Sequence, residues 1–210
     1  MGVVIFHQRF AGGKFSGKME NKIKSMIDAS IEAKESCKKF VSKIEQASDI
    51  ILDAFKNHNK ILIAGNGGSA SMSSHIAAEF VGRYKIERKG LPCIALACDM
   101  SIITAWSNDY GYDFVFERQI ESLASSGDVF IALSTSGNSK NLIMAIDAAK
   151  KLNVRVIGLL GKDGGKMKGM SNVEIIVPSN NTPSIQEAHL MILHIICEII
   201  DEHYGKQRKE

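Results

Sequence analysis

The sequence predicts an α/β fold built on a parallel sheet. Five short runs of apolar and β-branched residues alternate along the chain with amphipathic stretches at helical spacing. Two of these runs, within residues 131–133 and 156–160, are apolar without interruption, which suits strands buried on both faces. Two other stretches, 65–69 and 134–139, are glycine- and hydroxyl-rich turns between an apolar run and an amphipathic one. That is the strand, turn and helix order of phosphate sites in open α/β sheets.

The elements follow in a regular order. Residues 20–57 carry apolar side chains at helical spacing and predict two nearly continuous helices, for which a partner subunit is a reasonable packing surface. The predicted strands are 61–64, 92–97, 128–133, 155–159 and 173–177. The predicted helical segments are 68–84, irregular turns up to 108–111, 114–123, 139–152, a short helix within 161–170, and 183–203.

The length and charge of the chain narrow its class. At 210 residues it is long enough for one well-buried domain, which we place at 19–210. Residues 1–18 contain Arg9, Lys14 and Lys18 and no acid, and we expect a disordered leader or a tag there, with Met19 as the natural start. The rest has 23 basic and 23 acidic residues, so no net positive charge favours a nucleic-acid partner.

The cysteines and the hydropathy favour a cytoplasmic protein with no membrane partner. No apolar run reaches the ~18–20 residues of a membrane span. The four cysteines form no CxxC pair, and Cys93 and Cys98 fall in one predicted strand on opposite faces. We expect buried, reduced thiols, as in a reducing compartment.

The first turn, Gly65-Asn66-Gly67-Gly68-Ser69, has two interpretations. Glycines let a backbone turn sharply and approach a ligand closely. A tight strand–helix turn capped by Ser69 would use the same residues. The motif is not a Walker loop, because no Gly-Lys-Ser/Thr follows.

The second turn, 134–139, is more specific. Four hydroxyl side chains and a glycine stand at a predicted helix N-terminus, where backbone N–H groups are free to bind an anion: Ser134, Thr135, Ser136 and Ser139. No lysine lies within the turn, and neutral donors suit the monophosphate of a small metabolite. The alternative is a plain serine-rich loop.

Histidines and acids on two predicted helices could supply chemistry. His75 and Glu79 are four residues apart on one helix face, as in a metal or acid–base centre or in an ordinary surface contact. The last helix carries Gln186, His189 and His194, and His194 could equally be a hydrogen-bonded core residue. Gln186 and His194 stand ~12 Å and ~80° apart on that helix. One metal centre could bind both residues only if it lay between two fully extended side chains. Otherwise the two ligands of a centre come from different subunits.

These motifs together resemble the phosphoheptose isomerase family of sugar isomerase (SIS) domains. The similarity covers the chain after Met19 and includes seven ordered matches. They are residues 64–69, His75 with Glu79, 82–84, 108–111, 134–139, 161–167, and 185–189 with His194. The resemblance implies a three-layer α/β/α sandwich with a five-stranded parallel sheet, assembled as a homotetramer with active sites at subunit contacts.

The resemblance also implies an activity. The expected reaction converts sedoheptulose 7-phosphate to D-glycero-D-manno-heptose 7-phosphate through an enediol, an early step towards activated heptose for bacterial surface polysaccharide. Glu79 would be the base and His194 its acid–base partner. The substrate-binding residues implied are Asn66, Gly67, Gly68, Ser69, Asn108, Asp109, Ser134, Thr135, Ser136, Ser139 and Gln186. The implied cofactor is one zinc ion, held by His75, Glu79, Gln186 and His194.

Two rival functions belong to other classes. Non-catalytic members of this fold bind the replication initiator protein, but they lack the catalytic Glu and His that stand here as Glu79 and His194. An SIS sugar-phosphate sensor would normally carry a DNA-binding segment, and residues 19–58 do not have the composition of a helix-turn-helix. The sequence therefore favours an enzyme.

Overall fold

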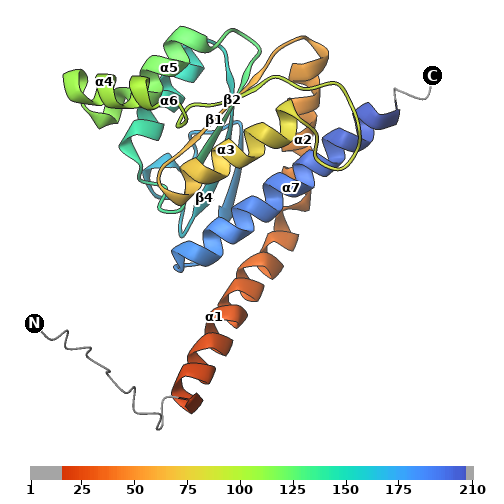
Figure 1. The fold of residues 1–210 in the computed structure, drawn as a ribbon, viewed down its shortest axis with the longest axis vertical. Coiled ribbons are helices and arrows are strands. Elements are labelled where there is room, and N and C mark those ends of the chain that lie inside the picture. Colours follow the sequence, from red (N-terminus) through yellow and green to blue (C-terminus); the bar gives the residue numbers. More distant parts are fainter. Residues whose placement is uncertain (1–15, 207–210) are drawn as a thin grey trace, which may run out of the picture.

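A five-stranded parallel sheet forms the centre of the molecule, with helices on both faces (Figure 1). The computed structural model describes residues 16–206. The strand order is β2-β1-β3-β4-β5, and each neighbouring pair is parallel. The strands are β1 (Ile61–Gly65), β2 (Cys93–Ala95), β3 (Val129–Ser134), β4 (Arg155–Gly161) and β5 (Val173–Val177). The predicted three-layer α/β/α sandwich is confirmed.

Alternate residues of the strands feed two separate cores, because successive side chains point to opposite faces of a sheet. Along β3, Ile131 packs in one core and Phe130 in the other. The Ile131 side is covered by α2 (Val41–Lys56), α3 (Gly68–Val81) and α7 (Thr182–Lys206). The opposite side is covered by α5 (Val115–Leu123) and α6 (Lys140–Lys151), which meet each other closely.

The first helix extends away from this sandwich. Helix α1 (Ser16–Ser36) passes through a short 3₁₀ segment (Cys37–Phe40) into α2, and its contacts with the body are mainly to α7 (Figure 1). It exposes a row of large apolar side chains: Met19, Ile23, Met26, Ile27 and Ile31. The helix begins three residues before Met19, and the remainder of the predicted leader, 1–15, lies outside the described residues.

Three local predictions are corrected. Helix α3 ends at Val81 rather than at residue 84, because Gly82 interrupts it. The segment before residue 111 is a continuous helix, α4 (Met100–Tyr110), whose N-terminus is capped by the carboxylate of Asp99. Strand β2 stops at Ala95, so Cys98 lies beyond it and is exposed.

The other cysteines behave as expected. Cys37, Cys93 and Cys197 are buried and form no disulfide, and burial raises the pKa of the Cys197 thiol to about 12. Among the helices within residues 16–206, none has both the length and the apolar character that a membrane crossing needs.

The order of the strands positions both turns found in the sequence. The chain moves outward from β1 to β2 and then returns to place β3 on the other side of β1. Open α/β sheets bind ligands outside the carboxyl ends of their strands at such a reversal. The turns after β1 and β3 therefore lie side by side at the expected binding edge, since Gly65 is in register with Leu133.

Candidate active site

The turn after β1 is contacted by the side chain of Gln186 and is not capped by Ser69. Gly67 has a φ of 55° and is the N-cap residue of α3, with no side-chain cap. A Cβ on Gly68 would lie 2.7 Å from the Nε2 atom of Gln186, so the amide of Gln186 approaches this turn closely and would have to shift if another residue stood there. Ser69 is buried and does not cap the helix, which rules out the capped-turn interpretation.

Asn66 is the polar centre of this turn. Its Nδ2 donates to Oδ1 of Asn141 (3.0 Å), and Nδ2 of Asn141 donates back to Oδ1 of Asn66 (2.9 Å). The hydroxyl of Tyr112 donates to the same Oδ1 atom at 2.8 Å. Asn141 belongs to the first turn of α6, so this amide pair ties the β1 turn to the helix that follows the second turn.

Residues 134–139, the hydroxyl loop, lead from β3 into α6. The Ser134 and Ser139 hydroxyls are 2.9 Å apart, and Ser134 Oγ accepts a hydrogen bond from the backbone N–H of Gly137. Ser136 Oγ accepts from the N–H of Asn138. Gly137 has a φ of 64°, and a Cβ there would collide with the carbonyl oxygen of Gly164. The predicted hydroxyls thus surround the start of α6, with Thr135, Ser136 and Ser139 partly exposed.

His75 and Glu79 lie on the same face of α3, as their spacing predicts. The Nε2 atom of His75 is 3.4 Å from Oε1 of Glu79. The His75 side chain is half-exposed and that of Glu79 is largely covered. By itself this would be an ordinary helix-surface pair.

A third side chain changes that interpretation. His194 comes from α7, and its Nε2 atom lies 3.1 Å from Nε2 of His75. The ligand atoms of His75, Glu79 and His194 all lie within 4.8 Å of one another. We call these three residues the α3–α7 cluster. All three come from one subunit, so this part of the site does not require His194 of a neighbour.

The environment of His194 disfavours the protonated form of its imidazole. Burial lowers its pKa, the positive charge of a protonated His75 and of Lys85 lowers it further, and Glu79 opposes the shift. The ring of Tyr84 stacks on it at 5.3 Å between centroids and 21° between planes. A neutral imidazole can accept a proton, bind a metal, or donate its single N–H.

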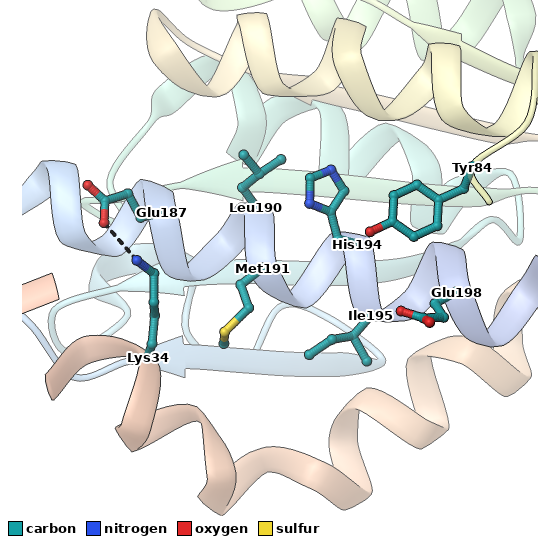
Figure 2. Close-up of a pocket in the computed structure, with 8 residues that line it drawn as sticks. All are labelled: Lys34, Tyr84, Glu187, Leu190, Met191, His194, Ile195 and Glu198. Carbon is teal, nitrogen blue, oxygen red and sulfur yellow. Dashed lines mark hydrogen bonds and ion pairs between the residues drawn. The ribbon is translucent and has the colours of Figure 1, made fainter. Parts of the chain in front are cut away.

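A hollow of about 420 Å³ opens beside this histidine (Figure 2). His194 and Leu190 point from α7 towards α3, while Met191 and Ile195 point towards the N-terminal helices. An ion pair between Lys34 and Glu187 bounds its far end. A second hollow, across the surface of α3, is lined by Gly68, His75 and Gln186 among others. Gln186 therefore shares this hollow with His75, although it stands two helical turns from His194.

His189 and His194, both on α7, have different surroundings. His189 is fully buried, its Nε2 donates to the carbonyl of Leu160 at 2.9 Å, and burial lowers its pKa to about 4. Its Nδ1 atom has no hydrogen-bond partner within the described residues. His189, and not His194, is therefore the hydrogen-bonded core histidine of this helix.

The remaining predicted residues are peripheral within one subunit. Asn108 and Asp109 are exposed in the last turn of α4, where the Asn108 amide donates to the Asp109 carboxylate. Tyr112, three residues further on, is the part of this segment that contacts Asn66. Residues 82–84 and 108–111 were family matches, but no role was predicted for Tyr84 or for the neighbouring Tyr112. Asn141 was not predicted at all. Only the Asn-Asp-Tyr-Gly motif beside Tyr112 could have directed attention there.

The α3–α7 cluster fits a divalent metal. Two ligands on a tetrahedral zinc ion, each about 2.0–2.1 Å from it, stand about 3.3 Å apart. The separations of His75 Nε2 from His194 Nε2 and from Glu79 Oε1 are 3.1 Å and 3.4 Å. Two imidazoles and a carboxylate are also a donor set that zinc accepts.

Comparisons with known proteins agree with this architecture. Residues 25–161 match the family model described as the SIS domain. A curated relative from Aliarcobacter butzleri, named phosphoheptose isomerase, is 56% identical over 158 residues, which cover 75% of this chain and 84% of the relative. The solved phosphoheptose isomerase of Neisseria gonorrhoeae superposes with a TM-score of 0.82 at 40% identity, covering 88% of this chain and 99% of that one. The corresponding enzyme from Francisella tularensis gives 0.84 at 36% identity, with coverages of 88% and 98%.

Proposed function

The chain is an isomerase of the phosphoheptose isomerase family, and we propose that it interconverts sedoheptulose 7-phosphate and D-glycero-D-manno-heptose 7-phosphate. The observation that carries the proposal is the meeting of His75, Glu79 and His194 within 4.8 Å, in a fold shared with named phosphoheptose isomerases.

The reaction requires a proton to move between two neighbouring carbons. In the direction of aldose formation, a base removes a proton from the hydroxyl-bearing carbon C1 of the ketose, and an enediol forms as the C2 carbonyl oxygen gains a proton. Reprotonation at C2 and loss of the hydroxyl proton at C1 then give the aldose. We assign the carbon-bound proton to Glu79 and the oxygen-bound proton to His194, whose imidazole can both accept and donate a proton.

The substrate phosphate is placed in the hydroxyl loop. The helix α6 begins there with backbone N–H groups at its N-terminus, where the helix dipole favours an anion. Thr135, Ser136 and Ser139 offer partly exposed hydroxyl donors, and Ser134 orients Ser139 from beneath. The carbon chain would then run past Asn66 and the glycines at 67 and 68 towards Gln186, with Asn108 and Asp109 contacting its hydroxyls from the end of α4.

We assign zinc to the α3–α7 cluster, with His75, Glu79 and His194 as ligands and Gln186 as a fourth donor. When bound, a divalent cation polarises a carbonyl oxygen and stabilises the negative charge of an enediolate. An oxygen of Glu79 or a ring nitrogen of His194 could not bind the ion and carry a proton at the same moment. An atom that holds the ion would therefore have to be free of it to act in proton transfer.

The active protein is proposed to be a homotetramer in the cytoplasm. The exposed apolar row of α1 supports a subunit interface, since monomeric proteins rarely leave such a stripe uncovered. The buried free thiols are those of a protein from a reducing compartment. The product would feed the synthesis of activated heptose for surface polysaccharide. A monomeric mass in light scattering at micromolar concentration would contradict the tetramer.

The test of the function is direct. Purified protein is incubated with sedoheptulose 7-phosphate, and the aldose product is detected with and without prior, verified metal removal. We expect turnover that chelation abolishes and added Zn²⁺ restores. Full activity without metal would make the ion incidental. Absence of turnover in the metal-loaded protein would revive the non-catalytic, initiator-binding reading, which the joint presence of Glu79 and His194 disfavours.

A further inference from the structure

A buried ion pair lies behind the α3–α7 cluster and has no part in the proposed chemistry. Arg88, in the loop 82–91 that follows α3, donates from Nε to Oδ1 of Asp201 on α7 at 2.6 Å. The two side chains are only 2% and 1% exposed. Burying two charges is costly unless their remaining donors and acceptors form hydrogen bonds. The other hydrogen bonds of Arg88 and Asp201 therefore identify the backbone segments that this pair connects.

Arg88 closes the end of α3. The carbonyls of the last turn of a helix have no partner within the helix. The guanidinium supplies one, donating from one terminal nitrogen to the carbonyl of Glu79 at 2.9 Å and from the other to that of Phe80 at 2.9 Å. Arg88 therefore holds the backbone of Glu79 itself. A planar fork with five N–H groups can serve these carbonyls and a carboxylate together, which an ammonium group cannot do.

Asp201 connects this loop to the helix of His194. It follows His194 by seven residues, so it lies about 10 Å further along nearly the same face of α7. Its Oδ2 atom accepts the backbone N–H groups of Lys85 (2.7 Å) and Ile86 (3.0 Å). Burial alone would raise the pKa of Asp201, but these backbone hydrogen bonds and Arg88 outweigh it and hold the pKa low, so the carboxylate is charged.

These contacts define how α3 docks on α7, and that docking defines the cluster. Figure 1 shows the two helices side by side, and they contact each other directly. Tyr84, from the same loop, stacks on the ring of His194. We propose that Arg88 and Asp201 are positioning residues that set the separation of Glu79 and His194 and thereby the rate of proton transfer. The inference rests on the proposed function, because it concerns the rate of that reaction.

The molecule contains a matched control. Asp128, also buried, accepts from Nζ of Lys60 at 2.6 Å and from the backbone N–H groups of Lys60 and Ser125. Both sites contain a buried aspartate with one cation and two backbone donors, and Asp128 accepts in addition from Nδ2 of Asn59 at 3.3 Å. It stands just before β1 and β3, whereas the Arg88–Asp201 pair joins the loop after α3 to α7.

The first experiment compares Asp201→Asn with Asp128→Asn. Both remove one buried charge and should lower the thermal midpoint. Small misplacements of reacting groups cost up to about 100-fold in rate, so we expect kcat of Asp201→Asn to fall about 10- to 100-fold with KM little changed. Asp128→Asn should keep kcat near the wild-type value. Equal losses of kcat in the two variants would overturn the proposal, since they would report general destabilisation.

Arg88→Lys is the second variant, in case Asp201→Asn does not fold. It keeps a cation for Asp201 but cannot also hold the carbonyls of Glu79 and Phe80. A similar loss in kcat with KM retained is expected, and wild-type kcat in Arg88→Lys would show that the fork is dispensable.

A readout independent of turnover separates this inference from the proposed function. Ring resonances of ¹⁵N-labelled histidine report the contact between His75 and His194, whether or not sedoheptulose 7-phosphate is the substrate. In the protein as purified, we expect these resonances to shift in Asp201→Asn and Arg88→Lys and to stay in place in Asp128→Asn. Unshifted resonances in both cluster-side variants would refute the positioning role even if the isomerase assay succeeds. Shifted resonances would support it even if that assay fails.

Discussion

The α3–α7 cluster and the hydroxyl loop are built in opposite ways. The loop is six consecutive residues whose hydroxyls and amides bond mainly to one another, as Ser134 does to Ser139 and to the N–H of Gly137. The cluster joins side chains from two helices, and His75 and His194 are separated by 119 residues in sequence. The geometry of the loop depends on local turn chemistry, whereas that of the cluster depends on how two helices pack.

This difference suggests a division of labour. A loop of neutral donors at a helix N-terminus can bind an anion without taking part in proton transfer. Two imidazoles and a carboxylate in contact can exchange protons or hold a metal. Changes in the cluster should therefore appear in kcat, and changes in the loop should appear in KM.

The strongest challenge to this division is Glu79→Gln. The amide keeps the shape of the side chain and removes the base, so kcat should fall by roughly 10²–10⁴-fold while substrate binding survives. His194→Asn should do nearly the same. Steady-state kinetics and direct binding of the substrate measure the two effects separately.

Glu121→Gln is the control for these variants, because this carboxylate pairs with Arg118 on the surface of α5. It should behave as wild type. If Glu79→Gln kept more than about a tenth of wild-type kcat, the loss would be too small for a general base, and the chemistry would have to be placed elsewhere.

Ser136→Ala tests the other side of the comparison. A lost hydrogen bond to a charged phosphate costs about 0.5–3 kcal/mol, so KM for the phosphosugar should rise about 2- to 150-fold with kcat nearly constant. Ser122→Ala, which removes an exposed hydroxyl bonded to its own helix on α5, should leave both constants unchanged. An unchanged KM in Ser136→Ala would mean that the phosphate binds outside the hydroxyl loop.

The smallest effect concerns stability and distinguishes His189 from His194. Burial lowers the pKa of His189 to about 4, below its unfolded value near 6.5. The unfolded chain therefore binds this proton first as the pH falls. The folded state therefore loses no stability through His189 above about pH 6.5 and loses it progressively towards pH 4. At pH 5 the free energy of unfolding is lower by about 2 kcal/mol.

Urea unfolding of wild type and His189→Gln at pH 7 and pH 5 measures this contribution. Glutamine can still donate to the Leu160 carbonyl but does not titrate. We expect the wild type to lose more stability on acidification than the variant. Equal losses would show that His189 is not the group responsible.

Local patterns were sufficient for much of this molecule. The five strands, the helices after them and the hydroxyl loop follow from hydrophobic periodicity and from glycine and hydroxyl placement, because these act over a few residues. The predicted ends of the elements were less accurate. Helix α3 ends early at Gly82, and Asp99 caps a full helix where irregular turns were expected. Pairing of His75 with Glu79 also follows from a helical spacing of four residues.

Other features were decided only by the tertiary structure. The spacing of residues along α7 left open whether His194 is a core residue. Only the packing of α7 on β4 shows that His189 is the buried histidine and that His194 points towards α3. Arg88 and Asp201 had no visible pattern, because their partners are backbone groups brought together by the loop after α3. Contacts between residues a hundred positions apart in sequence depend on how the helices pack. The periodicity of one helix predicts which of its faces is apolar, but not which side chains of another helix that face will contact.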